Sequence, residues 1–301
     1  MTLYIGVDGG GTHTRAVVVD RAGRELGRAE GGGSVVRVDA PAQAARAVID
    51  TVRSAAEVAG AELPAATLWA GLAGAGSREA RVTVEHELAG AGLARDVIVG
   101  TDVEAAFQDA FGDGPGVLLI AGTGSIAWAR DAEGQTERVG GWGERLGDEG
   151  SGFSIGLEAL RSVARAEDGR GEATRLQAVV LEELGLSEPG ELVAWTATAS
   201  KAQVAGLVPV VAAAAGRGDA VAAHIMDRAV AELTEHLTAV VGRGGSGGSA
   251  PDLVLWGGLL QPGGSLRVAM ERAVTPLPLR LVTRDVDPAL GAATLARKTR
   301  S

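Results

Sequence analysis

Two glycine-rich turns decide the fold: VDGGGTHT at residues 7–14 and AGTGS at residues 121–125. Each turn follows a short apolar run, LYIGV at residues 3–7 and VLLIA at residues 117–121, and a second strand-like segment comes after it. Apolar runs of this length that end in glycines predict β-strands joined by tight turns. Because glycine lacks a Cβ and tolerates positive φ, both turns also allow backbone N–H groups to approach a phosphate group.

The hairpins that follow the two turns resemble one another. VVVDRAGRELGRAEGG at residues 17–32 and AWARDAEGQTERVGG at residues 127–141 each read as strand, turn and polar strand. One matching hairpin would mean little, since such turns are common. A glycine turn before each of the two hairpins favours an internal duplication.

The remaining pattern completes two α/β halves. Residues from about 153 to 241 look helical, with no strand signal, and the apolar run LVLW at residues 253–256 ends in Gly257 and Gly258. We predict an N-terminal lobe at residues 1–112 and a C-terminal lobe at residues 113–301. The second lobe contains the helical insert, and the terminal helix from about residue 288 is expected to pack back on the first lobe. A cleft between the halves is expected to hold the ligands.

The composition excludes several classes of protein. A net charge of -10 argues against nucleic acid as a partner, and the absence of cysteine excludes disulfides, thiolate metal sites and iron–sulfur clusters. No run approaches the roughly 20 apolar residues that a membrane span needs. The N-terminus MTLYIGVDGGG does not resemble a signal peptide. We therefore expect a soluble cytoplasmic protein with no nucleic-acid or membrane partner.

The two turns carry residue types that suit a magnesium-bound polyphosphate. Asp8 ends the first strand beside the glycines and is a candidate Mg²⁺ ligand, directly or through water. Thr12, Thr123 and Ser125 add hydroxyl groups that can donate to phosphate oxygens. A glycine hairpin turn is the alternative for either motif alone. The P-loop is excluded, because it requires GK[ST] and neither Lys201 nor Lys298 follows a glycine.

Asp102 is a candidate general base. It follows the apolar run VIVG and precedes the helical segment VEAAFQDAF, so it lies at a strand end and a helix start. Helix N-termini favour an ionised carboxylate, which can accept the proton of a hydroxyl that attacks a γ-phosphate. The alternative is that Asp102 is the N-cap of the helix, a position where aspartate is among the preferred residues.

The stretch GGWGERLGDEGSGF at residues 140–153 is a candidate sugar site. Trp142 lies among glycines, and Asp148 and Glu149 follow between Gly147 and Gly150. An aromatic ring can cover the apolar face of a sugar while carboxylates accept from its hydroxyl groups. A rigid structural loop is the alternative.

Gly257 and Gly258 have two interpretations as well: they could approach a nucleotide base or ribose, or they could form a strand-to-helix turn. Two histidines of the long insert, His224 and His236, are expected on a polar helix face.

The sequence resembles the N-acetylglucosamine kinase family in a combination of four motifs: DGGGT, TD before a helix, GTGS and GGWGxxLGDEGSG. This family is grouped with the BadF/BadG-type ATPases in the actin, Hsp70 and sugar kinase superfamily. The resemblance covers nearly the whole chain, including LWGG and the terminal DPALGAATLAR. It implies an α/β fold of two duplicated actin-like (ribonuclease H-like) domains with a nucleotide cleft between them, and a homodimer.

The resemblance also implies roles for residues. ATP phosphates would contact Gly10, Gly11, Thr12, Gly122, Thr123 and Gly124, with Gly257 and Gly258 near the adenosine. Asp102 would be the base, and Gly141, Trp142, Asp148 and Thr123 would lie near the sugar. Family kinases place an asparagine after the third strand on the sugar, and here the matching segment offers Ser34.

The implied reaction is phosphorylation of an amino sugar, N-acetylglucosamine or glucosamine, at the 6-hydroxyl by MgATP. Two other functions remain open. One is an ATPase that couples nucleotide-driven closure to a partner protein, as dehydratase activators of this group do, although those depend on cysteine-bound clusters. The other is a non-catalytic sugar or nucleotide sensor.

Overall fold

The structure is a computed structural model that describes residues 1–37, 40–243 and 250–299. The chain divides into two compact units. Unit 1 consists of Met1–Asp113 together with Arg284–Ser301, and unit 2 is Gly114–Thr283. Each unit has its own sheet and its own apolar core.

Unit 1 is built on a five-stranded sheet in the order β3-β2-β1-β4-β5. Its strands are β1 (Leu3–Gly9), β2 (His13–Asp20), β3 (Glu25–Gly32), β4 (Ala65–Leu72) and β5 (Ala94–Gly100). The first three pair antiparallel, as the sequence predicts, and β1, β4 and β5 run parallel. Strand β4 is buried along its whole length, which is typical of a central parallel strand covered on both faces.

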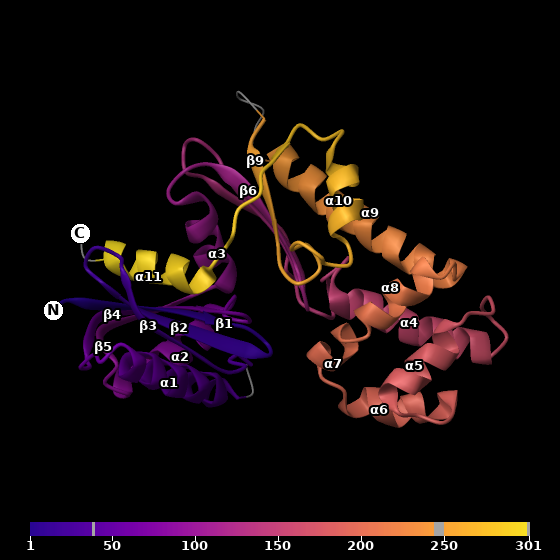
Figure 1. The fold of residues 1–301 in the computed structure, drawn as a ribbon, viewed down its shortest axis with the longest axis horizontal. Helices are drawn as coiled ribbons and strands as arrows, with labels where there is room; N and C mark the ends of the chain where they lie inside the picture. The colour runs from indigo at the N-terminus through magenta and orange to yellow at the C-terminus, as the bar shows by residue number, and fades with distance from the viewer. Residues whose placement is uncertain (38–39, 244–249, 300–301) are drawn as a thin grey trace. The chain divides into compact units, whose positions relative to one another are not determined.

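Four helices cover the two faces of this sheet. They are α1 (Pro41–Val58), α2 (Arg78–Gly90), α3 (Asp102–Phe111) and α11 (Pro288–Lys298). Helices α1 and α2 lie on one face, and α11 lies on the other (Figure 1). Gly6 of β1 allows α11 to approach closely, because a Cβ at this position would overlap the backbone of Ala289 and Ala293. The C-terminal segment is thereby part of the core of unit 1.

Unit 2 has a five-stranded sheet in the order β10-β9-β6-β7-β8. Taken from its other edge, the order is β8-β7-β6-β9-β10, which repeats the order β3-β2-β1-β4-β5 of unit 1. Its strands are β6 (Gly116–Ala121), β7 (Ser125–Arg130), β8 (Thr136–Gly140), β9 (Asp252–Trp256) and β10 (Arg280–Leu281). Again the first three strands pair antiparallel, and β6, β9 and β10 run parallel. The same order and directions in both units confirm the predicted duplicated α/β fold.

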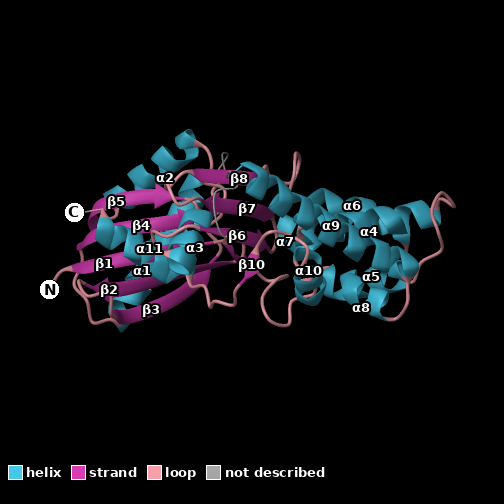
Figure 2. Ribbon diagram, turned by 90° about the horizontal axis from the view of Figure 1, so that it is seen from above, coloured by secondary structure: helices cyan, strands magenta, loops and turns pink. Residues whose placement is uncertain are grey.

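The insert of unit 2 is helical, and no strand occurs in it among the described residues 153–241. Its helices are α4 (Gly152–Glu167), α5 (Leu176–Leu184), the 3₁₀ helix η1 (Pro189–Glu191), α6 (Leu192–Thr198), α7 (Lys201–Ala205), α8 (Val208–Gly216) and α9 (Ala220–Arg243), and α10 (Arg267–Val274) follows β9. Figure 2 shows the helices α4 to α9 grouped together. Their apolar faces form one core with the sheet of unit 2.

The expected position of His236 is wrong. The residue is 8% exposed, not on a polar face, and its imidazole packs so close to Gly140 that a Cβ there would lie 3.0 Å from the ring. Its Nε2 is 3.6 Å from a carboxylate oxygen of Glu149. The repeat of apolar residues along α9 indicated which face is buried, but not that a polar residue would share it.

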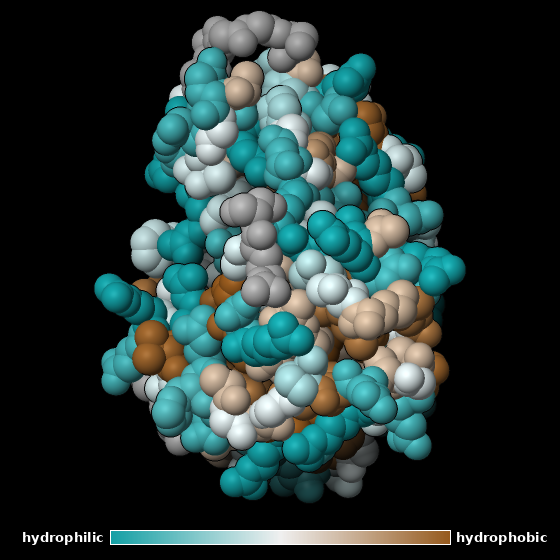
Figure 3. Space-filling view, turned by 90° about the vertical axis from the view of Figure 1, so that its left-hand side faces the viewer, coloured by the Kyte–Doolittle hydropathy of each residue, from teal (hydrophilic) through white to brown (hydrophobic). Residues whose placement is uncertain are grey.

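On the face shown in Figure 3, hydrophilic residues predominate and hydrophobic ones are scattered between them. Within the described part of the chain, no single helix has both the length and the apolar composition to cross a membrane. One sharply bent pair, residues 201–216 with 220–243, meets the two criteria together.

Candidate functional site

Unit 1 brings Asp8 and Asp102 to the same edge of its sheet. Asp8 pairs in register with Gly71 of β4, and Gly71 pairs with Gly100 of β5, after which Thr101 and Asp102 begin α3. The carboxyl ends of parallel strands meet at one edge of a sheet, and this edge is the usual ligand position in α/β folds. Two carboxylates that are far apart in sequence therefore lie near each other.

The pKa of Asp8 reports this arrangement. Burial, and after it the negative charge of Asp102, raise the pKa of Asp8 to about 7, while Arg15 opposes both effects. A carboxylate that is both desolvated and repelled by a second carboxylate is unfavourable without a cation. This edge of unit 1 is thus a place where positive charge would be stabilised.

The interpretation of Asp102 as an N-cap is wrong. The N-cap of α3 is Thr101, whose hydroxyl accepts from the backbone N–H of Glu104, while the Glu104 carboxylate accepts from the N–H of Thr101. This capping box could have been found in the sequence, since TDVE matches the pattern [ST]-x-x-[EQ]. Because Thr101 and Glu104 cap the helix, Asp102 is not needed for that role.

The first glycine turn contains two glycines that packing does not require. A Cβ on Gly11 would meet no atom within 4 Å, and one on Gly10 would lie 3.6 Å from the carbonyl oxygen of His13, an ordinary contact. Neither residue has a positive φ. The adjacent Thr12 is exposed, and its hydroxyl lies 2.9 Å from Nδ1 of His13. The fold of unit 1 therefore tolerates a side chain at these positions, so the glycines call for another explanation.

Ser34 lies beneath this turn rather than at the surface. It is 1% exposed, and its hydroxyl accepts a hydrogen bond of 2.8 Å from the hydroxyl of Thr14. Its backbone N–H donates to the carbonyl of Gly10. In this arrangement Ser34 supports the turn from the interior, and contact with a sugar stays a prediction.

In unit 2, the second glycine turn lies beside Gly257 and Gly258. Gly257 has a φ of 100°, and a Cβ there would overlap the backbone of Ala121, so glycine is required. A Cβ on Gly122 would instead lie 3.8 Å from the backbone nitrogen of Gly258, an ordinary contact, and one on Gly258 would meet nothing within 4 Å. The two segments come together because β6 and β9 are parallel neighbours that end at the same edge.

The loop between β8 and α4 is tied to the second turn by hydrogen bonds. The backbone N–H of Gly141 donates to the carbonyl of Ser125, and the N–H of Gly152 donates to the carbonyl of Gly122. The Ser125 hydroxyl donates to the carbonyl of Glu149 at 2.6 Å, and Ser125 is 3% exposed. The expectation that Ser125 is available to phosphate is therefore wrong, since its hydroxyl is used to hold the loop.

Trp142 and Asp148 occupy opposite environments within this loop. Trp142 is 64% exposed, with the Arg138 guanidinium 4.8 Å from its ring centroid, so one aromatic surface remains accessible. Asp148 is only 3% exposed, and its Oδ1 accepts from the backbone N–H of Ser125 at 3.4 Å. The loop thus presents an exposed ring and an inward carboxylate that lies against the phosphate turn.

Lys201 is a residue that the sequence did not indicate. Its ammonium forms an ion pair of 2.5 Å with Oδ2 of Asp148, although it starts a different helix, α7. A Cβ on Gly124 would lie 3.0 Å from Oδ1 of Asp148 and 3.2 Å from Nζ of Lys201. The sequence suggested a phosphate turn without lysine, because no lysine is near it along the chain. The fold places one there.

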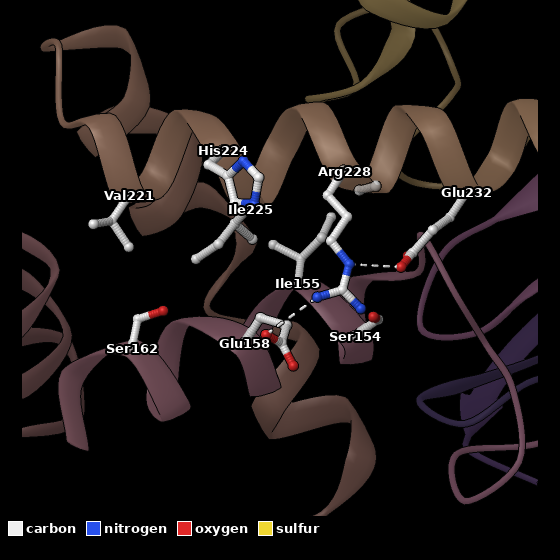
Figure 4. A pocket seen from close by; sticks show the side chains of 10 residues that line it. Ser154, Ile155, Glu158, Ser162, Val221, His224, Ile225, Arg228 and Glu232 are labelled. Carbon is white, nitrogen blue, oxygen red and sulfur yellow. Dashed lines mark hydrogen bonds and ion pairs between the residues drawn. The ribbon is translucent and has the colours of Figure 1, made fainter. Parts of the chain in front are cut away.

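A pocket lies between α4 and α9 (Figure 4). Here Arg228 pairs with Glu232 at 2.9 Å and with Glu158 at 3.5 Å. The other oxygen of Glu232 accepts from the backbone N–H of Gly150 at 2.8 Å. None of the predicted site residues lines the pocket, but Glu232, which lines it, anchors the loop between β8 and α4 to α9 through its hydrogen bond from Gly150.

The carboxylates of unit 1 suit magnesium, which needs few protein ligands, better than they suit a metal ion that is bound by protein side chains alone. Within the described ranges, no group of three or more histidine, cysteine, aspartate or glutamate side chains could hold a metal ion. Magnesium needs only one or two carboxylates, because water and substrate phosphates complete its octahedral shell. Asp8, destabilised as an anion beside Asp102, meets that requirement.

Comparisons with known proteins agree with these features. The profile of the BadF/BadG/BcrA/BcrD ATPase family matches residues 5–296. An N-acetylmuramic acid/N-acetylglucosamine kinase of Clostridium acetobutylicum is 31% identical, over 80% of this chain and 80% of that protein. An N-acetyl-D-glucosamine kinase of Dictyostelium discoideum is 30% identical, over 98% of this chain and 97% of that protein.

A solved structure extends the likeness to the whole fold. It is that of a proposed N-acetylglucosamine kinase of Chromobacterium violaceum, with a TM-score of 0.81 and 31% identity. The match covers 98% of this chain and 99% of that one. The predicted family is therefore confirmed: this chain belongs to the BadF/BadG/BcrA/BcrD ATPase family.

Proposed function

We propose that this chain is an ATP-dependent sugar kinase whose acceptor is an amino sugar, N-acetylglucosamine or glucosamine, and whose product is the 6-phosphate. Its relatives are named as kinases of such sugars, which supports the sugar kinase class. The observation that carries the proposal from this structure is the set of glycines at Gly10, Gly11, Gly122 and Gly258. Packing does not require them, and they occupy the carboxyl edges of both sheets.

In the proposed reaction, the glycine turns bind the phosphates of ATP through backbone N–H groups. Asp102 accepts the proton of the sugar hydroxyl while its oxygen attacks the γ-phosphorus in line with the bond to ADP. Trp142 covers an apolar face of the sugar, and Thr123 and Asp148 hold its hydroxyl groups. The products are the sugar phosphate and ADP, and the proton ends on Asp102.

Asp8 is the residue that we assign to Mg²⁺, directly or through water. When bound, the ion would neutralise charge on the phosphate oxygens. Asp8 and Asp102 would then have different roles at the same sheet edge. Asp8 would bind the cation, and Asp102 would accept the proton of the acceptor hydroxyl. A homodimer and a cytoplasmic location stay predictions.

The test of the proposed function is an ADP-release screen of the purified chain with MgATP. The acceptors are glucose, glucosamine, N-acetylglucosamine, N-acetylmannosamine and N-acetylmuramate, with a no-sugar control. We expect ADP release that depends on an amino sugar, with the sugar 6-phosphate detected by mass spectrometry or NMR. Sugar-independent ADP release would favour an ATPase that couples closure to a partner. Binding without ADP release would favour a sensor.

The glycine turns allow a second test that separates binding from folding. We expect Gly11→Ala and Gly122→Ala to leave the melting temperature of the free protein unchanged, because a Cβ fits at both positions. Nucleotide affinity should fall at least about tenfold, or about 1.4 kcal/mol, since the methyl group occupies space reserved for phosphate. Isothermal titration with ATP and ADP measures this loss.

Gly90→Ala is the matched control for these variants. Gly90 ends α2, outside both turns, and a Cβ there also meets nothing within 4 Å. It should leave nucleotide affinity unchanged. If Gly11→Ala and Gly122→Ala bind nucleotide as the Gly90→Ala variant does, the phosphate role of the turns is wrong.

A further inference from the structure

Asp148 combines two unfavourable properties that call for an explanation. It is the one non-glycine residue with positive φ among the described residues, at 61°. It is also buried, with 3% of its surface exposed. A side chain in the left-handed region costs conformational energy, and a buried carboxylate requires a partner. Such a residue persists where the surrounding structure holds it, and strained residues of this kind cluster at functional sites.

The partner that holds it comes from a distant part of unit 2. Lys201 is the first residue of α7, where Ser200 caps the helix by accepting from the backbone N–H of Gln203. Its side chain is 30% exposed, and Nζ lies 2.5 Å from Oδ2 of Asp148. The cap fixes the start of α7, so the lysine approaches the loop from a defined position.

The ion pair also touches the phosphate turn. Oδ1 of Asp148 accepts from the backbone N–H of Ser125, and Gly124 lies so close that a Cβ would approach both partners of the ion pair. Three segments therefore meet at one pair of charges: the turn at residues 121–125, the loop at residues 140–151 and helix α7. No other lysine occurs in unit 2.

We infer that Lys201 is a positioning residue that holds Asp148 for the acceptor sugar and fixes the loop against the phosphate turn. The inference rests on the proposed function. A carboxylate has about four acceptor positions, and the contacts with Ser125 and Lys201 use two of them. Asp148 can therefore accept from a sugar hydroxyl without releasing the lysine. The ammonium keeps the carboxylate oriented and offsets its burial.

A double-mutant cycle in the full-length chain tests this inference, with the variants Lys201→Met, Asp148→Asn and the double variant. Each single change should raise KM for the amino sugar at least about tenfold, because it breaks a buried charge pair at the sugar. KM for ATP should change less than about threefold. If Lys201 acts through Asp148, the double variant should have a sugar KM within about threefold of Asp148→Asn alone.

Lys298→Met is the matched control. Lys298 also forms an ion pair of 2.5 Å with an aspartate, Asp113, but at an exposed position of unit 1. It should leave both KM values unchanged. Lys201→Arg keeps the charge and should restore most of the sugar affinity that Lys201→Met loses. Lys201→Met leaves the buried carboxylate of Asp148 without its partner, which can impair folding. The double variant removes both charges, so it can still be measured in that case.

The outcomes separate this inference from the proposed function. If the wild type phosphorylates an amino sugar and Lys201→Met has the kinetic constants of Lys298→Met, the inference is wrong and the proposed function stands. Multiplicative effects of the two single changes on sugar KM would also overturn it, since Lys201 would then act independently of Asp148. If the wild type phosphorylates no sugar, both fail together.

Discussion

Asp102→Asn is expected to lower kcat for sugar phosphorylation by at least about 100-fold while nucleotide binding is retained. The amide has nearly the shape of the carboxylate but cannot accept the proton of the attacking hydroxyl. Helix α3 should still form, because its capping box uses Thr101 and Glu104. The measurement is the initial rate of amino-sugar-dependent ADP release, together with isothermal titration of ADP.

The control for Asp102→Asn is Asp50→Asn, the same chemical change at an exposed position of α1. It should leave both the rate and the melting temperature unchanged. Asp102→Asn should not destabilise the free protein, because it removes a negative charge that raises the pKa of Asp8. Undiminished turnover in Asp102→Asn would remove this residue from the role of base.

Asp8→Asn is expected to have opposite effects on activity and on stability. If Asp8 holds Mg²⁺, the loss of its charge should lower kcat/KM for MgATP by about 100-fold or more, since the ion stabilises the charge of the transition state. In the metal-free protein, the same change should raise the melting temperature at pH 8. A residue retained for packing would show a loss of stability instead.

The sign of the stability effect follows from the pKa. Asp8 has a pKa of about 7 in the folded protein, compared with its ordinary value of 3.8. Between these values, the folded state binds more protons than the unfolded state, so the free energy of unfolding of the wild type falls as pH rises from about 4 to about 7. Above the folded pKa the loss is complete.

Thermal unfolding in EDTA between pH 4.5 and 8 measures this effect. The melting temperature of Asp8→Asn minus that of the wild type should grow as pH rises through this range, and Mg²⁺ with nucleotide should reduce it. Asp50→Asn should show no such trend. A difference that does not change with pH, or a destabilised Asp8→Asn protein at pH 8, would contradict the assignment of Asp8.

Local sequence was sufficient to predict most elements of the fold. The apolar run at residues 253–256 and the helix start at Pro288 depend on neighbours within a few residues, and the structure has β9 at Asp252–Trp256 and α11 at Pro288–Lys298. The duplication was readable as well, because each hairpin is a contiguous segment. Asp8 and Asp102 could be chosen as candidates because Asp8 lies at the end of one apolar strand and Asp102 lies just after the end of another.

Only the tertiary structure decided which distant residues meet. The pairing of Lys201 with Asp148, the burial of His236 against Gly140 and the position of Ser34 below the first turn all join segments that are far apart in the chain. Strand and turn patterns depend on short-range periodicity and glycine geometry, which a sequence displays directly. Contacts between an insert helix and a loop depend on how apolar faces pack, and no local pattern specifies that partner.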